Sequence, residues 1–499
     1  MGGIQGCKNR NMHPLPFPGW KRRLQLVVLA MSTTLVVACG GGGGSSGSSS
    51  SSGSSGSTSS GSTSGGSASG GSGTTTSSLV LTLPTHGITA ANLAVVAITG
   101  DANSQAMASY YQQKRGVPAA NMINVTLPSS GDTISDTDFA AVRSQITAQM
   151  PANAQAVLLA WGAGEPSRVV GTSCSMSITS AVTFGYSASY CSNAGSSCIA
   201  TTNSPYFDSE TTQPFTDLSL RPTMMLGTST LAEAQTLIDR GVSGDASAPS
   251  GTGWLMRTSD TQRSVRYSDY TSLPASWQGL FTLNYVDNSA GSSGGDTISN
   301  QSNVMFYFTG LPTVANLATN TFRPGAIGDT LTSFGGVLPS GHQGQITVLD
   351  WLNAGLTASY GSVEEPCNFT QKFSQASVLL DHYWRGDTLI EAYWKSVQEP
   401  GEGLFVGEPL SHPWPDAASL AIAGGQYQIS TRSLRPRGTY TLDYLGSDGS
   451  WHNLGTFTGT RAGAVTLTAP LAPSTATKLR WTGPCASNEQ QACTLATSS

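Results

Sequence analysis

Charged residues are scarce in this chain of 499 residues, at 11% of the total, whereas typical soluble domains have about 25%. The 29 Asp and Glu residues outnumber the 24 Lys and Arg residues, so the formal net charge is -5. A nucleic-acid-binding protein carries a basic patch and has a high isoelectric point, so this class of partner is excluded. An acid-rich disordered chain is excluded as well.

Histidine is also rare, with 6 residues in the whole chain. The sequence contains no H-E-x-x-H, Walker A or EF-hand pattern, and no C-x-x-C pair that would favour zinc. One oxygen-rich loop, with Asp287, Asn288 and Asp296, has the residue types of a calcium site, but such loops are more often only solvated. We therefore expect no metal and no cofactor.

Residues 1–38 have the pattern of a bacterial export signal. A basic stretch without acidic residues is followed by the apolar run 24–37, which is shorter than the roughly 20 residues that a bilayer-spanning helix needs. The sequence VVAC at 36–39 resembles a lipobox, in which Cys39 becomes the lipid-modified first residue. The alternative is an ordinary signal peptide with a chance cysteine. Because Gly40 replaces the Asp that would retain the protein at the inner membrane, we predict a lipid anchor in the outer membrane of a Gram-negative bacterium.

The remaining chain divides by composition into a linker and two domains. Residues 39–78 are almost only Gly, Ser and Thr, which is typical of a flexible linker. Residues 79–412 alternate between apolar strands and helices, which predicts an α/β domain with a doubly wound, mostly parallel sheet. Residues 417–484 contain short alternating stretches between turns, which predicts a small β-sandwich. A polar tail follows at 485–499.

Within the α/β region, capping residues and apolar runs predict individual elements. Ser135 with Asp138, and Thr230 with Glu233, have the spacing of helix N-terminal caps. Residues 171–220 are rich in Ser, Thr and Cys and are predicted to form a long excursion loop. Buried strands are predicted at 93–99, 122–127, 156–161, 222–227, 304–308, 330–334 and 356–360.

Six cysteines follow the signal segment, and an even number in an exported protein favours disulfides. Cys485 and Cys493 bracket a short polar loop and are expected to pair. Cys191 and Cys198 could pair in the same way. The two cysteines left over are Cys174 and Cys367. Spacing does not decide whether these two bond to each other or stay free.

Reactive side chains follow the predicted strands at one edge of the sheet. His342 lies in a Gly-rich loop, and Glu365 and Cys367 follow the strand predicted at 356–360. Loops at the carboxyl ends of parallel strands form the binding crevice of such sheets. A neighbouring imidazole lowers the pKa of a thiol and supplies a base, so these residues could form a catalytic centre. The alternative is that Cys367 is in a disulfide and His342 contacts solvent.

The segment YYQQKRGVP at 110–118 resembles the Y-Y-x-x-x-R-G-[IV]-P block of an uncharacterised family of exported bacterial proteins. The later segments that match the same family are 323–327, 331–334, 361–366, 389–393 and 407–410. The resemblance extends over roughly 90–412, and it implies a shared fold for this region rather than a particular activity.

The layout is also similar to that of gingipain-type cysteine peptidases, which have a caspase-like α/β fold followed by an immunoglobulin-like domain. In that family a His-Gly follows one core strand and the nucleophilic Cys follows the next. Thr309 stands in the position of the His here, and Ser333 stands about where the Cys would be. This departure favours a non-catalytic relative that binds a protein or peptide. The alternative is a cysteine or serine peptidase with a displaced site, in which Cys367 or Ser333 attacks, His342 is the base and Glu365 orients it.

Overall fold

The computed structural model describes residues 79–128, 131–192, 198–342, 344–461, 463–485 and 490–498. The predicted export signal, the linker and Cys39 lie outside these ranges. All described residues belong to one compact unit. Within it, every helix falls short of the length and hydrophobicity that a membrane crossing requires.

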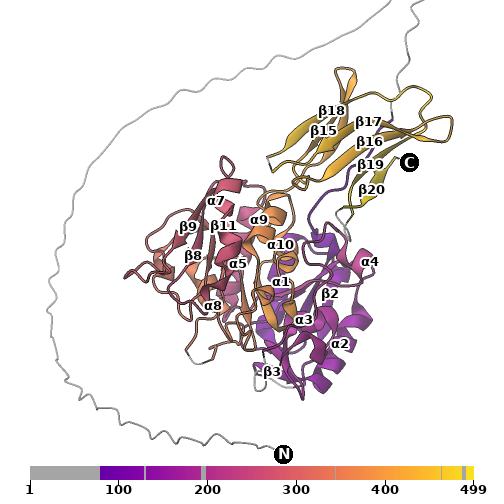
Figure 1. The fold of residues 1–499 in the computed structure, drawn as a ribbon. Coiled ribbons are helices and arrows are strands. Elements are labelled where there is room, and N and C mark those ends of the chain that lie inside the picture. The colour runs from indigo at the N-terminus through magenta and orange to yellow at the C-terminus, as the bar shows by residue number, and fades with distance from the viewer. Residues whose placement is uncertain are drawn as a thin grey trace, which may run out of the picture. The chain divides into compact units, whose positions relative to one another are not determined.

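Ten strands of the described chain form one large sheet (Figure 1). Their spatial order is β2 (Met122–Val125), β1 (Leu93–Ile98), β4 (Ala156–Leu159), β7 (Thr223–Met225), β13 (Gly403–Gly407), β12 (Ala358–Ser362), β11 (Phe322–Thr330), β10 (Val304–Thr309), β8 (Thr252–Arg257) and β9 (Thr282–Asp287). All neighbours are parallel except β12 and β13, which are antiparallel. The predicted mostly parallel α/β sheet is therefore present, as two parallel halves that run in opposite directions.

Helices lie between the strands in chain order, and Figure 1 shows the N-terminal elements in indigo and purple and the later ones in magenta and orange. The helices are α1 (Ala102–Arg115), α2 (Asp136–Gln149), α3 (Ile178–Phe184), α4 (Pro214–Leu218), α5 (Leu231–Gly244), α6 (Tyr267–Tyr270), α7 (Leu273–Ser276), α8 (Val348–Ala354), α9 (Ala376–Trp384) and α10 (Leu389–Lys395). Helix α1 packs along α5, and α5 packs against β11.

The helix caps follow the sequence closely. The Ser135 hydroxyl accepts from the Asp138 backbone N–H at 3.0 Å and begins α2, while Thr230 and Glu233 form a reciprocal capping box at the start of α5. Helix α1 ends at Gly116, which adopts a left-handed conformation with a φ of 68°. Local chemistry therefore sets these boundaries.

The core of the sheet is apolar on both faces. Every residue of β1 and of β13 is buried, as expected for strands covered by helices on both sides. Aromatic rings fill the space around β13, where Trp394 stacks on Phe405 with ring centroids 4.3 Å apart. Tyr360 of β12 lies edge-on to Phe405 of β13 with centroids 4.9 Å apart, so ring contacts also join the two halves of the sheet at their antiparallel junction.

Two predictions for this region are wrong. Residues 171–220 are not one loop, because they contain strand β6 (Ser175–Ser177) and helices α3 and α4. Strand β6 belongs to a small sheet in the order β3 (Thr133–Ser135), β5 (Arg168–Val170), β6. The strand predicted at 330–334 is instead the end of β11 and the loop that follows it. In this loop Gly336 has no room for a side chain, because a Cβ on it would lie 2.4 Å from the Gly361 carbonyl oxygen.

The C-terminal part of the described chain contains two antiparallel sheets. One has the order β14 (Ser419–Ala423), β15 (Gln426–Thr431), β18 (Val465–Pro470), and the other β17 (Trp451–Thr458), β16 (Thr439–Leu445), β19 (Lys478–Pro484), β20 (Ala492–Thr497). Leu442 and Trp481 lie in the core between them, and Leu81 and Leu83 from the start of the described chain join it. The predicted polar tail contains β20, whose backbone pairs with β19.

Candidate functional site

The candidate residues of the second half-sheet lie beyond the carboxyl ends of three neighbouring strands. Thr309 is the last residue of β10, Ser333 follows the end of β11 at Thr330, and Glu365 follows the end of β12 at Ser362. Because β10, β11 and β12 are parallel, these ends share one edge of the sheet.

Ser333 and Glu365 are brought together. The Ser333 hydroxyl donates to Glu365 Oε2 at 2.6 Å, and the Cys367 backbone N–H donates to Glu365 Oε1 at 2.9 Å. Ser333 is buried, with 7% of its surface exposed. The carboxylate therefore bridges the loop after β11 and the loop after β12.

Gln345 and Arg263 hold the loop of Ser333 from its other side. Gln345 Oε1 accepts from the Thr332 hydroxyl and, at 3.1 Å, from the Ser333 backbone N–H. Arg263 Nε donates to the Thr332 hydroxyl at 3.2 Å. Sequence reasoning missed both residues, because a single Gln in a loop and a single Arg in another have no pattern of their own.

The backbone around this site is strained. Phe334, Cys367 and Asn368 have φ angles of 57°, 56° and 59°, in the left-handed region that residues other than glycine rarely adopt. Such conformations cost of order 1–3 kcal/mol each and concentrate at functional sites. Two of the three follow Glu365 closely, and the third follows Ser333.

His342 does not join the Ser333–Glu365 pair. The His342 side chain is exposed, and its ring lies edge-on against Phe334 with centroids 4.9 Å apart. The single hydroxyl proton of Ser333 is directed to Glu365 and not to this imidazole. The expected arrangement of a Ser333 nucleophile with a His342 base is therefore absent among the described residues.

Cys367 is bonded to Cys198, which confirms the alternative that Cys367 is in a disulfide and contradicts the alternative of a nucleophilic Cys367 thiol. A sulfur in a disulfide has no thiolate form with which to attack. The suggested Cys191–Cys198 pair is also wrong, because Cys191 is bonded to Cys174. Spacing suggested the nearer partner, whereas the fold brings together cysteines 169 residues apart. The predicted Cys485–Cys493 disulfide is confirmed.

Thr309 is built into a buried ionic cluster next to this edge. Its carbonyl oxygen accepts from Arg266 Nη2 at 2.7 Å, and Arg266 Nη1 donates to Asp329 at 2.7 Å. The second Asp329 oxygen accepts from the hydroxyls of Ser374, at 2.5 Å, and Tyr393, at 2.9 Å. Burial opposes the charge of Arg266, but Asp329 outweighs it and raises the pKa of the guanidinium. The Thr309 hydroxyl itself is buried without a hydrogen-bond partner in the described part of the chain.

The segments that carry the family resemblance supply residues to further buried clusters. Arg115 of the first segment forms ion pairs with Glu408 of the last segment and with Asp245 at the end of α5. Tyr111 donates to Glu408 at 2.6 Å, and Glu391 accepts from the Ile88 backbone N–H at 2.8 Å. These matched residues therefore stabilise the fold.

His382 is a buried, hydrogen-bonded residue of α9. Its ring nitrogens lie 2.9 Å from Asp387 and 3.1 Å from Asp208. Burial lowers its pKa, as do the charges of Lys395 and Arg385, but the two carboxylates outweigh them and the pKa of His382 is raised. His452 is an exposed residue of β17.

No group of three or more His, Cys, Asp or Glu side chains is placed to hold a metal in the described ranges. In the oxygen-rich loop, Asp287 pairs with Arg257 at 2.9 Å, and Asp296 accepts from Ser259 and Asn288.

A cavity of about 560 Å³ lies beside the Ser333 loop. Gln345, which holds the backbone of Ser333, lines it together with Val314, Leu317 and Ile346. Asp350 and Asn353 of α8 supply polar groups to its wall. Apolar walls with a few polar groups are typical of ligand sites of this size.

Comparison with known proteins gives little beyond the structure itself. No family profile matches the sequence, and no curated protein matches it. A solved structure described as a protease has a TM-score of 0.40 and 10% sequence identity, and the alignment covers 82% of this chain and 97% of that chain. A similarity of this size does not establish a shared fold or activity.

Proposed function

We propose that this protein is an exported, lipid-anchored protein of the cell envelope whose α/β domain binds a ligand without cleaving it. The observation that carries the proposal is the Cys198–Cys367 disulfide, which removes the thiol expected of a cysteine peptidase. Thr309, in the position that the gingipain resemblance gives to the catalytic His, has no basic group. Among the described residues, this edge of the sheet thus has the Ser333–Glu365 hydrogen bond but no cysteine–histidine dyad.

The bound ligand would occupy the cavity next to the Ser333 loop. The apolar side chains of Val314 and Leu317 in the cavity wall suit a peptide side chain, and Asp350 and Gln345 would fix the orientation of the peptide. Shape and polarity in this cavity support a protein or peptide ligand, which is also what the gingipain-like layout favours.

A serine hydrolase is the second candidate, and the Ser333–Glu365 hydrogen bond favours it. In such a reaction Ser333 Oγ would attack a carbonyl carbon while its proton passed to Glu365. Glu365 would return the proton to the leaving group, and water would later release the acyl group.

Fluorophosphonate labelling separates the two candidates. We expect the purified full-length protein to show no labelling of Ser333 by mass spectrometry, because no imidazole activates its hydroxyl. The matched control is Ser333→Ala, which should leave the labelling pattern unchanged. Labelling at Ser333 that disappears in Ser333→Ala, and falls in Glu365→Gln, would replace the binding proposal with the hydrolase.

The lipid anchor is tested at Cys39. The basic segment, the short apolar run and the VVAC sequence support lipidation. We expect Cys39→Ala to shift the protein from the outer-membrane fraction to soluble or unprocessed forms in cell fractionation. The matched control is Cys7→Ala within the signal segment, which should not change the distribution. Normal processing and membrane association of Cys39→Ala would contradict the anchor.

A further inference from the structure

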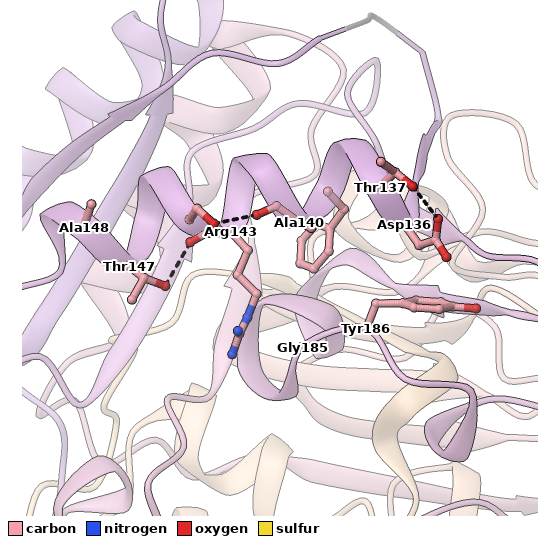
Figure 2. A pocket seen from close by; sticks show the side chains of 10 residues that line it. Asp136, Thr137, Ala140, Arg143, Thr147, Ala148, Gly185 and Tyr186 are labelled. Carbon is pink, nitrogen blue, oxygen red and sulfur yellow. Dashed lines mark hydrogen bonds between the residues drawn. The ribbon is translucent and has the colours of Figure 1, made fainter.

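A second cavity lies on the first half of the α/β domain, along helix α2. It has a volume of about 780 Å³ and lies between α2 and the turn that follows α3 (Figure 2). Phe139 and Ala140 form part of its α2 wall, and Gly185 and Tyr186 form the opposite wall. Figure 2 shows Arg143 extending from α2 toward Gly185, while Asp136 lies farther along the helix near Tyr186.

Arg143 also lines a smaller cavity of about 200 Å³, so it borders both spaces. Thr147 is shared in the same way, and Arg221 and Phe215 form part of the wall of the smaller cavity. We name the two cavities together the α2 groove. None of its lining residues belongs to the Ser333 site.

The arginines of the α2 groove lack acidic partners. Arg143 forms no ion pair or side-chain hydrogen bond within the described residues, and its Nε is buried without a partner. Arg221 donates from Nε to the Ala154 carbonyl at 2.8 Å, and its guanidinium lies 3.2 Å from the centre of the Phe215 ring. Burial without a compensating carboxylate lowers the pKa of Arg221.

Three arginines whose side chains are almost fully buried are paired with carboxylates, whereas Arg240, half-buried like Arg143, donates only to backbone carbonyls. Arg115 contacts Glu408 and Asp245, Arg266 contacts Asp329, and Arg385 contacts Glu210. A buried cation without an anion is costly, so residues of this kind are normally paired. Arg143 thus offers the α2 groove hydrogen-bond donors that the described chain does not use, and Asp136 is the one carboxylate among the residues that line the larger cavity.

We propose that the α2 groove binds an acidic peptide and that Arg143 contacts one of its side-chain carboxylates. A guanidinium matches a carboxylate with two parallel hydrogen bonds, and a partly desolvated pair is stronger than one in open water. The volume of the larger cavity lies in the range of ligand sites. Tyr186 offers ring surface to the rest of the peptide, and Arg221 adds positive potential in the smaller cavity.

The direct test measures binding of a fluorescein-labelled hexaglutamate peptide to the full-length protein by fluorescence anisotropy at low salt. We expect Arg143→Ala to weaken binding about tenfold or more, because a charge-assisted contact is lost. Arg143→Lys should retain part of the affinity for hexaglutamate, because lysine keeps the positive charge but cannot donate two parallel hydrogen bonds to one carboxylate. Lys478→Ala removes an equal charge from an exposed position of β19 and should change the affinity less than twofold.

A second variant blocks the α2 groove without touching its charges. Ala140 is exposed on α2 and lines the larger cavity, so Ala140→Trp should fill the space, keep the thermal unfolding midpoint and still reduce hexaglutamate binding. Sodium sulfate and free glutamate serve as competitors. The proposal would be overturned if Arg143→Ala and Lys478→Ala lost the same amount of hexaglutamate affinity, or if the parent protein showed no detectable binding. Displacement by sulfate or glutamate at the same concentration as unlabelled hexaglutamate would also overturn it, in favour of a site for small anions.

Discussion

Asp329→Ala is expected to lower the free energy of unfolding by about 3–5 kcal/mol, because it leaves a buried cation without its partner. Asp329 is fully buried, and its two oxygens accept from Arg266, Ser374 and Tyr393. Without the carboxylate, the Arg266 guanidinium keeps only the Thr309 and Ser374 carbonyls and the Ser374 hydroxyl as acceptors among the described residues. Urea unfolding followed by tryptophan fluorescence measures the loss.

Asp287→Ala is the matched control for this prediction. Asp287 also pairs with an arginine, at 2.9 Å, but the pair lies at the surface, where solvent screens it. We expect no measurable change in its unfolding midpoint. The double variant Arg266→Met with Asp329→Ala should be more stable than Asp329→Ala alone, because it removes the unpaired charge. If Asp329→Ala were as stable as Asp287→Ala, the result would contradict a stabilising role for the Arg266–Asp329 ion pair.

Removal of the Cys198–Cys367 disulfide should have the other large effect. The two residues are 169 apart in sequence, and a cross-link that closes so long a loop restricts the unfolded chain by about 5 kcal/mol on the chain-entropy estimate. We expect the double variant Cys198→Ala with Cys367→Ala to unfold at a clearly lower urea concentration than the parent. The comparison is made without reductant, so that the other disulfides stay intact.

The double variant Cys485→Ala with Cys493→Ala is the reference against which the stability lost with the Cys198–Cys367 disulfide is compared. The Cys485–Cys493 pair spans only 8 residues, and the same estimate gives about 2.5 kcal/mol. The longer bridge should therefore cost about twice as much to remove as the shorter one. Equal losses for the two pairs, or a larger loss for the shorter one, would show that loop closure does not govern the contribution of these bridges.

The elements that sequence predicted best are those with local signals. The unbroken apolar run of β1 and the caps at Ser135 and Thr230 depend on neighbours a few residues away, and the structure has the predicted elements at each. Strand β11 was displaced because Arg323, Pro324 and Gly325 interrupt the apolar pattern at its start. Pairing with β10, which the sequence does not display, keeps these residues in the strand.

The arrangement of the half-sheets and the cysteine partners could not be predicted in the same way. Alternation of strands and helices predicts parallel neighbours, but nothing local shows that β13 inserts antiparallel to β12. Cys198 pairs with Cys367 because tertiary folding brings the excursion after α3 to the loop after β12.

The candidate site was only partly accessible to sequence reasoning. Strand ends pointed correctly to the loops of Ser333 and Glu365, since the sheet edge follows from topology. The direction of each side chain did not follow, so His342 was expected at the site and Gln345 was not. Nothing in the sequence marked Arg143 as a binding residue, because a single arginine on a predicted helix has the same pattern as a solvent-exposed arginine.

The position of β13 has a consequence for the growing chain. Synthesis proceeds from the N-terminus, and β13 is the last strand of the large sheet to be made, yet it pairs with both β7 and β12 at the centre. Until residues 403–407 emerge, each half-sheet has an unpaired edge, at β7 and at β12. Unpaired edges readily recruit other strands and lead to aggregation. A nascent chain of this protein is therefore most in need of a chaperone just before its α/β domain is complete.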